Sequence, residues 1–217
     1  MRTREQILDA VLDCGVIAIV RLADRERLLK TAEAIYEGGV RVIEFTLNTP
    51  GALDAIRSCR DAMGDAIIGA GTVLSAEDAE AALDAGAEII VAPDTKAMVV
   101  ETARGRGAVA IPGAYTPTEI ARAMELGADL IKLFPAKGLG PEYVREVLAP
   151  LDGARLVPTG GVTVDNAGAY LEAGAAALAV GGGIVNNALV ASGDFDAIAR
   201  NARAYREAVL RARELEA

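Results

Sequence analysis

One local pattern recurs along this chain and limits the folds that it can adopt. Four times, a helix-like segment ends at a glycine and a short apolar run follows it. The glycines are Gly39, Gly86, Gly127 and Gly174. Glycine is favoured just beyond a helix because it adopts a positive φ angle without a steric penalty. The continuous apolar runs that follow are typical of parallel strands buried on both faces.

Four further apolar runs complete a set of eight strand candidates. The eight are residues 16–20, 42–46, 66–70, 89–91, 108–111, 130–134, 155–158 and 177–180. A helix-like pattern follows each of them, and alternating strands and helices imply a parallel sheet. Eight such units in 217 residues fit a closed (β/α)₈ TIM barrel better than the alternative, an open doubly wound sheet. We expect an α/β fold with a single barrel domain over residues 1–217 and an additional N-terminal helix, residues 1–14, that caps the barrel.

The composition fits one packed domain and argues against several kinds of partner. Hydrophobic residues make up 52% of the chain and aromatic residues 4%, so the core is expected to consist of small aliphatic side chains. The net charge of −9 disfavours nucleic acid, whose phosphates would be repelled. No apolar run approaches the roughly 20 residues of a membrane span, and no signal peptide is evident. We expect a cytoplasmic chain without a nucleic-acid or membrane partner.

The chain has no histidine and two cysteines, Cys14 and Cys59. Both cysteines fall in helix-like segments without a CxxC spacing, so buried free thiols are expected. The lack of histidine removes the commonest general base and the commonest zinc ligand. Acid–base chemistry must therefore use carboxylates, lysine, tyrosine or water, and no metal site is expected.

Lys132 is the residue that most strongly suggests catalysis, because it lies inside the apolar run 130–134. Burial disfavours the charged ammonium and favours the neutral amine, which is a nucleophile. The alternative is a lysine that pairs with a carboxylate or extends to solvent. The other lysines, Lys30, Lys96 and Lys137, are expected on the surface.

Glu44 is a carboxylate within another buried run, residues 42–46. With strand alternation, Glu44, Thr46 and Asn48 share one face. If that face meets Lys132, Glu44 can transfer protons, and no histidine is present to take this role. The alternative is a plain ion pair with arginine or lysine.

Active sites of barrels lie at the carboxyl ends of the strands, and polar residues or glycines follow most of the predicted strands. The candidate substrate-binding residues there are Arg21, Thr46, Asn48, Thr72, Pro93, Phe134, Thr159, Gly160, Gly161, Gly182 and Gly183. The glycine turns follow the last two strands, where backbone N–H groups of barrels commonly bind phosphate.

Taken in order, six segments of the chain resemble the 2-keto-3-deoxy-6-phosphogluconate (KDPG) aldolase family, including its 6-phosphogalactonate relatives. The segments are residues 39–47, 68–74, 111–113, 116–119, 132–136 and 158–162. The resemblance implies a class I aldolase that cleaves KDPG to pyruvate and glyceraldehyde 3-phosphate. It also implies a cytoplasmic homotrimer that needs neither a metal nor an organic cofactor.

The resemblance assigns roles to individual residues. Lys132 matches the Schiff-base lysine and Glu44 the carboxylate that moves protons. Thr72 matches a neighbour of the substrate carboxylate, while Pro93 and Phe134 match walls of the pocket. The remaining matches are Arg21, a basic residue of part of the family, and the phosphate-end residues Thr159, Gly160, Gly161, Gly182 and Gly183.

Two departures from the family pattern leave the substrate open. Asn48 stands where many gluconate-type enzymes have arginine, and Gly183 replaces a serine often seen at the phosphate end. Residues 140–144 look more like the galactonate type, whereas residues 158–161 look like the gluconate type. The 6-phosphogalactonate acid and unphosphorylated 4-hydroxy-2-oxoglutarate therefore stay as alternative substrates.

Two other classes of function stay open as well. A phosphate-binding epimerase or isomerase would use acid–base pairs and leave Lys132 as an electrostatic group. A non-catalytic trimeric scaffold would keep the fold alone, although an intact pair of Glu44 and Lys132 argues against it.

Overall fold

The computed structural model describes residues 2–216, so Met1 and Ala217, the end residues of the expected domain, lie outside the described residues. Strands and helices alternate along the chain. The strands are β1 (Val16–Val20), β2 (Val42–Thr46), β3 (Ile67–Gly71), β4 (Ile89–Val91), β5 (Val109–Ile111), β6 (Gly113–Ala114), β7 (Ile131–Leu133), β8 (Leu156–Pro158) and β9 (Leu178–Val180). The α-helices are α1 (Arg4–Cys14), α2 (Leu28–Glu37), α3 (Ala52–Ala62), α4 (Ala76–Asp84), α5 (Ala97–Gly105), α6 (Pro117–Glu125), α7 (Gly140–Leu148), α8 (Val164–Glu172), α9 (Asn187–Ser192) and α10 (Phe195–Glu216). Two 3₁₀ turns, η1 (Arg25–Arg27) and η2 (Ala136–Gly138), follow β1 and β7.

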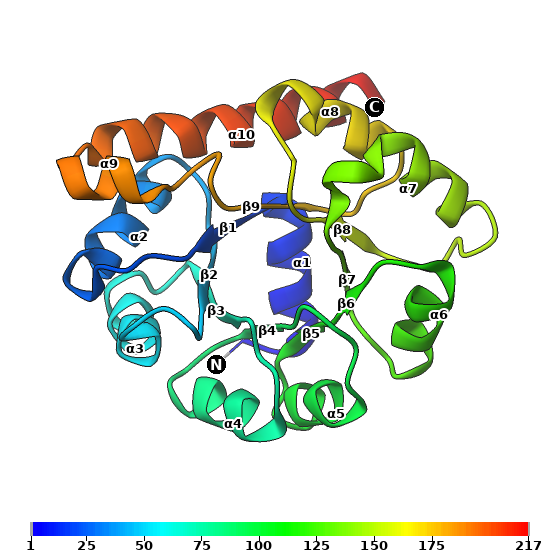
Figure 1. The fold of residues 1–217 in the computed structure, drawn as a ribbon, viewed down its shortest axis with the longest axis horizontal. Helices are drawn as coiled ribbons and strands as arrows, with labels where there is room; N and C mark the ends of the chain where they lie inside the picture. Colours follow the sequence, from blue (N-terminus) through cyan, green and yellow to red (C-terminus); the bar gives the residue numbers. More distant parts are fainter. Residues whose placement is uncertain (1, 217) are drawn as a thin grey trace.

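All paired strands run parallel, and they form two curved sheets. One sheet has the order β5-β4-β3-β2-β1-β9, and the other has the order β6-β7-β8. A parallel bridge between Thr159 and Ala179 joins the end of β8 to β9. The strands form an inner wall, and helices α2 to α10 lie around its outside, whereas α1 is seen through the middle of the ring (Figure 1). The structure is therefore an α/β fold with a curled parallel sheet, as the alternating pattern predicts.

The buried strands and the glycine turns follow the sequence pattern closely. Every residue of β2 and β3 is buried, because helices cover the outer face and packed side chains fill the inner one. The turn glycines Gly39, Gly86, Gly127 and Gly174 have φ angles of 90°, 99°, 80° and 98°. These values lie in the left-handed region that a side chain disfavours, which explains why glycine ends each of these helices.

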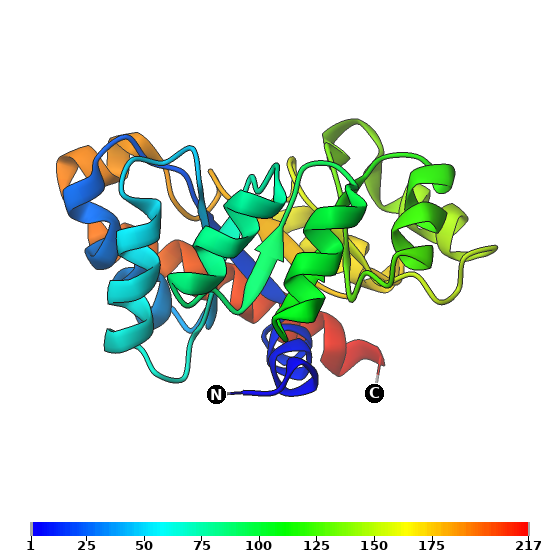
Figure 2. The same ribbon diagram turned by 90° about the horizontal axis from the view of Figure 1, so that it is seen from below.

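Helix α1 lies at the amino ends of the strands. Thr3 caps it in a reciprocal arrangement with Gln6, and Gly15, with a φ angle of 65°, ends it and leads straight into β1. The helix contacts β1, β3 and β5 and lies below them, on the side of the molecule where both chain ends are found (Figure 2). Because α1 connects directly to the start of β1, the carboxyl ends of the strands face the opposite side.

Two details differ from the sequence-based expectation. The short strand β6 was not predicted, because Pro112 and Gly113 suggest a loop there. Asn48 does not continue the alternation of Glu44 and Thr46. The backbone N–H of Thr49 donates to the carbonyl of Thr46 (2.8 Å), so the chain turns at this point and Asn48 is exposed. Strand alternation therefore ends at Thr46 and does not itself place Asn48 on the face of Glu44.

Within residues 2–216, no helix combines the length and the apolar character that crossing a membrane requires.

Candidate active site

Lys132 lies in the middle of β7 and is buried, with 6% of its surface exposed. Its neighbours in register are Gly113 on β6 and Val157 on β8, so it is held between two backbone strands. Its Nζ atom lies 5.2 Å from the centroid of the Phe134 ring. A lysine in this position is largely shielded from water.

Glu44 lies on β2 and is completely buried. Neither carboxylate oxygen has a hydrogen-bond partner among the described residues. Burial raises the pKa of Glu44, while the positive charges of Lys132 and Arg21 act in the opposite direction. Strands β2 and β7, which are far apart in sequence, thus bring Glu44 and Lys132 close enough to interact.

Thr46 lies next to Glu44 on the inner face of β2 and is fully buried. Its hydroxyl lies 3.0 Å from that of Thr49, which is itself 3% exposed. Thr49 was not singled out from the sequence, although the Thr49-Pro50-Gly51 sequence is a turn signal that could have drawn attention to it. The pair fixes the turn that follows β2, next to the buried carboxylate.

The other candidates around Glu44 lie at the rim. Arg21 directly follows β1 and is exposed, and it still lowers the pKa of Glu44 through its charge. Thr72 follows β3 with a φ angle of 57°, an uncommon value for a residue with a branched side chain. Pro93 and Phe134 line one cavity of about 460 Å³ at the carboxyl ends of the strands. These positions agree with a binding rim around a buried reactive pair.

The glycine turn after β8 lies against the same region. Gly160 and Gly161 have φ angles of 85° and 82°, so their backbone requires glycine. A Cβ atom on Gly160 would lie 3.7 Å from the Phe134 ring. The Phe134 ring is therefore in contact with this turn on one side and lies near the Lys132 amine on the other. The preceding residue, Thr159, is buried and anchored, since its N–H donates to the carbonyl of Leu133 (3.0 Å).

The second glycine turn follows β9, and the bridge between Thr159 and Ala179 connects the two turns through neighbouring strands. Gly182 and Gly183 are exposed, and neither has a φ angle in the left-handed region. A side chain on Gly182 would meet no protein atom within 4 Å. The space above Gly182 is thus open, which suits the approach of a ligand to the backbone.

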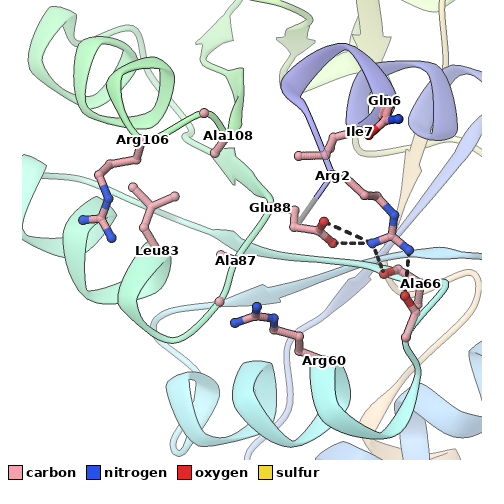
Figure 3. Close-up of a pocket in the computed structure, with 13 residues that line it drawn as sticks. Arg2, Gln6, Ile7, Arg60, Ala66, Leu83, Ala87, Glu88, Arg106 and Ala108 are labelled. Carbon is pink, nitrogen blue, oxygen red and sulfur yellow. Dashed lines mark hydrogen bonds and ion pairs between the residues drawn. The ribbon is translucent and has the colours of Figure 1, made fainter.

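A larger cavity, of about 630 Å³, lies at the amino ends of β3, β4 and β5 (Figure 3). Arg2 lines this cavity, and its guanidinium group donates to both carboxylate oxygens of Glu88 and to the carbonyls of Gly64 and Ala66. Arg106, at another side of the cavity, is paired with Glu80 and Asp84. These arginines tie the base of the fold together, whereas the smaller cavity lies at the carboxyl ends of the strands and is lined by Phe134, whose ring lies near the Lys132 amine.

A bound metal ion requires a cluster of donor side chains. Within the described part of the chain, no cluster of three or more histidine, cysteine, aspartate or glutamate residues could hold one.

The fold and the site define a class of protein: an α/β enzyme whose candidate centre is a buried lysine beside a buried carboxylate at the carboxyl ends of parallel strands. The chain belongs to the KDPG and KHG aldolase family, whose model matches residues 7–201. The resemblance noted in the sequence is thereby confirmed.

Two curated relatives and one solved structure illustrate the similarity. The chain is 39% identical to the 2-dehydro-3-deoxy-phosphogluconate aldolase of Treponema pallidum, over 88% of this chain and 92% of the relative. It is 35% identical to the 2-dehydro-3-deoxy-6-phosphogalactonate aldolase of Escherichia coli, over 89% and 96%. The KDPG aldolase of Legionella pneumophila, with pyruvate captured as a covalent carbinolamine, superimposes with a TM-score of 0.83 at 25% identity, over 92% of this chain and 98% of that one.

Proposed function

We propose that this chain is a class I aldolase that reversibly cleaves KDPG to pyruvate and glyceraldehyde 3-phosphate, with Lys132 as the Schiff-base residue. The observation that carries the proposal is the buried Lys132 of β7, whose charge acts on the buried Glu44 of β2. The carbinolamine captured in the Legionella pneumophila relative supports it, because a carbinolamine forms from a carbonyl carbon and an amine.

The reaction begins at the Lys132 amine. The neutral Nζ attacks the C2 ketone of the substrate, and the resulting carbinolamine loses water to give a protonated imine. The imine withdraws the electron pair of the C3–C4 bond as that bond breaks, while the C4 hydroxyl loses its proton and becomes the aldehyde. The enamine that remains is protonated at C3, and water hydrolyses the imine to release pyruvate and the free lysine.

Glu44 is the residue that handles these protons. Because burial raises its pKa, the protonated acid is accessible closer to neutral pH than for an exposed glutamate. The acid can donate a proton to the departing carbinolamine hydroxyl, and the carboxylate can accept the proton of the C4 hydroxyl, directly or through water. Both of its oxygens lack other hydrogen-bond partners among the described residues, so both are available to the substrate or to that water.

The two ends of the substrate are assigned to opposite sides of Lys132. The carboxylate end lies towards the rim after β1–β3, which carries Arg21, Asn48 and Thr72, with Thr46 below it. The pocket walls are Pro93 and Phe134. The phosphate end lies at the turns after β8 and β9, and its residues are Thr159, Gly160, Gly161, Gly182 and Gly183. Backbone N–H groups there would hold an anion in a chain of net charge −9 without adding fixed positive charge.

The alternative substrates keep the same chemistry. The exposed turn that carries Asn48 offers no fixed charge for the substrate carboxylate. The 6-phosphogalactonate acid and 4-hydroxy-2-oxoglutarate are therefore candidate substrates beside KDPG. Turnover of these three acids, compared under one set of conditions, ranks them. An epimerase or isomerase, or a non-catalytic scaffold, would cleave none of them.

We further propose that the strands close into a complete (β/α)₈ barrel with α1 as the cap at its base. Backbone hydrogen bonds from Asp129 and Lys132 to the carbonyls of Ala110 and Pro112 support a seam between the β5–β6 segment and β7. The bridge between Thr159 and Ala179 supports the opposite seam. Deuterium exchange at the amides of Lys132 and Ala176 tests both seams, since Lys132 donates to the carbonyl of Pro112 and Ala176 to the carbonyl of Leu156 (2.9 Å each), and closed seams protect these amides.

The assembly that we propose is a cytoplasmic homotrimer acting on a small 2-keto acid, with no nucleic-acid or membrane partner and no cofactor. Family membership supports the trimer. Exposed apolar side chains such as Leu74, Met98 and Tyr115 would suit a contact between copies. Light scattering after gel filtration measures the oligomer, and a monomeric mass would overturn this part of the proposal.

The central claim is tested by trapping the imine. The protein is incubated with pyruvate and sodium borohydride, and the modified residue is identified by mass spectrometry. We expect a reduced adduct on Lys132 that is absent in Lys132→Ala, and cleavage of KDPG that is lost in the same variant. Lys96→Ala serves as the control, because Lys96 is exposed and paired with Asp94. If no adduct forms on Lys132, the proposed function is wrong.

A further inference from the structure

Tyr205 is a buried residue of α10 that contacts both glycine turns. It is 4% exposed, and its hydroxyl donates to the carbonyl of Val162 at 3.2 Å, one residue beyond Gly161. The same hydroxyl occupies the position that a Cβ atom on Gly183 would need. One phenol side chain thus lies against the turn after β8 and the turn after β9 at once.

The contact explains why residue 183 is a glycine. Gly183 has no positive φ angle, so its backbone conformation is open to any residue. Space is what excludes a side chain, because a Cβ atom there would overlap the Tyr205 hydroxyl and lie 2.9 Å from Cζ and 3.2 Å from Cε2 of the ring. A tyrosine ring moves as a rigid unit, so it cannot yield by bending one terminal atom. Tyr205 in this position therefore requires a glycine at position 183.

Tyr205 also connects the hydrophobic core to the exposed turn after β9. Its ring belongs to the hydrophobic core, whereas Gly183, which it touches, is exposed. The hydroxyl end is the part that contacts the turns, and a buried tyrosine hydroxyl keeps its place because it needs a hydrogen-bond partner. The carbonyl of Val162 provides that partner, and Val162 as a whole is 7% exposed.

We propose that Tyr205 is a positioning residue that sets the separation of the two glycine turns and thereby the affinity for the phosphate end of the substrate. The inference rests on the proposed function, in which these turns bind the phosphate. Tyr205 itself touches no reacting atom. It acts through Gly183 and Val162. Its phenol group occupies the space that a side chain at position 183 would need.

The test compares Tyr205→Phe with the unchanged protein on two aldehydes, in the aldol direction with pyruvate. Phenylalanine keeps the ring and removes the hydrogen bond to Val162. We expect the KM for glyceraldehyde 3-phosphate to rise about three- to tenfold, the scale of one lost hydrogen bond, with little change in the KM for unphosphorylated glyceraldehyde. Equal KM changes for both aldehydes, or none for either, would overturn the inference.

Tyr170→Phe is the matched control. Tyr170 is equally buried, and its hydroxyl donates to the carbonyl of Ala136 (3.3 Å), outside both glycine turns. A general loosening of the fold would raise the KM for the phosphorylated aldehyde in both variants, whereas the inference requires the change in Tyr205→Phe alone.

A second measurement addresses the contact without using activity. Gly183→Ala is made in the unchanged protein and in Tyr205→Phe, and the free energies of unfolding are compared in a double-mutant cycle. Because the clashing hydroxyl is absent in Tyr205→Phe, the alanine should destabilise that background less. Additive effects would show that Gly183 and Tyr205 are independent.

Borohydride trapping of pyruvate on Lys132 in every variant separates the two possible failures. If the unchanged protein forms no adduct, the proposed function fails. If adducts form normally but the ratio of the two KM values is the same in Tyr205→Phe, only the role of Tyr205 fails.

Discussion

The Glu44 carboxylate fills the space that a side chain on Gly71 would occupy. A Cβ atom on Gly71 would overlap Oε1 of Glu44 and lie 2.7 Å from its Cγ. Gly71 ends β3, which runs beside β2, and its φ angle is not in the left-handed region. The glycine is therefore needed for space and not for backbone conformation. It allows the Glu44 carboxyl group to sit fully buried beside β3.

Replacing Gly71 with alanine should consequently displace Glu44 and impair catalysis. We expect a loss of stability of about 1–3 kcal/mol from overpacking, and a fall in kcat of at least roughly tenfold because the proton-transferring group is misplaced. Gly69→Ala is the control, since its Cβ atom would meet Ile89 and not Glu44. It should lose similar stability but keep most of its kcat. Steady-state kinetics and thermal unfolding measure both, and equal kcat values would contradict the argument.

A second prediction separates the two members of the reactive pair. Glu44→Gln keeps the size of the side chain but cannot accept or donate a proton as a carboxyl group does. We expect kcat for KDPG cleavage to fall by about a hundredfold or more, the usual scale of general acid–base catalysis. The adduct of pyruvate on Lys132 should still be trapped by borohydride, although more slowly. Unchanged turnover would remove the proton-transfer role.

Much of this molecule follows from local sequence patterns. Gly86 and Gly127 mark helix ends because the φ angle that ends a helix is a local requirement, and the buried strands follow from runs of apolar residues. Lys132 and Glu44 stand out for the same reason, as charged residues within apolar runs. Local patterns thus suffice to single out Lys132 and Glu44 as candidate site residues and to predict an α/β fold.

What the sequence did not predict depends on contacts between distant segments. Tyr205 is far from Gly183 along the chain, and only the packing of α10 against the turn after β9 brings them together. The same holds for Gly71 and Glu44, which come from different strands. Strand alternation cannot place Asn48 for a local reason, because β2 ends at Thr46 and the chain turns there. Such a turn could have been recognised from Pro50 and Gly51.

Lys137 was expected to be an ordinary surface lysine, and it is exposed. Its Cα atom, however, would lie 2.7 Å from a Cβ atom on Gly161, so the residue packs directly against the first glycine turn. A positive charge beside this turn should assist phosphate binding in an acidic chain. We expect Lys137→Ala to raise the KM for glyceraldehyde 3-phosphate about three- to tenfold, and added salt to reduce the difference.

The control for this prediction is Lys30→Ala. Lys30 is exposed on α2, with its Nζ atom 4.7 Å from the centroid of the Phe195 ring. Replacing Lys30 with alanine removes the same charge at a different place. Its KM values should stay unchanged. A similar rise in both variants would mean that the global charge, and not the position of Lys137, sets the affinity.

The two cysteines should be unreactive in the folded protein. Cys14 and Cys59 are both buried, and burial raises the pKa of Cys59 to about 12. Because the thiolate is the reactive form, a thiol reagent at pH 8 should label neither residue until the protein unfolds. In urea, both should be labelled within minutes. Rapid labelling of the native protein would show that α1 or α3 opens readily.

The pH dependence of stability offers a test of the Glu44 environment that requires no substrate. Burial raises the pKa of Glu44 in the folded state. An unfolded glutamate titrates at about pH 4.3. Between that pH and the pKa of the folded state, the folded protein holds a proton that the unfolded protein has lost. Stability contributed by this group is therefore present at low pH and is lost as the pH rises through that interval. Glu44→Gln removes this dependence, so its melting temperature relative to the unchanged protein should rise from pH 4 to pH 8.

Glu119→Gln should behave in the opposite way. Backbone N–H groups of Tyr115 and Thr116 donate to its carboxylate and lower the pKa of Glu119. Its stabilising contribution is present above the unfolded pKa and is lost as the pH falls through the folded one. The glutamine variant should thus lose melting temperature at pH 8 and little at acid pH. Calorimetry on both variants checks the two signs together, and parallel pH profiles would mean that Glu44 is not held in the buried environment described for it.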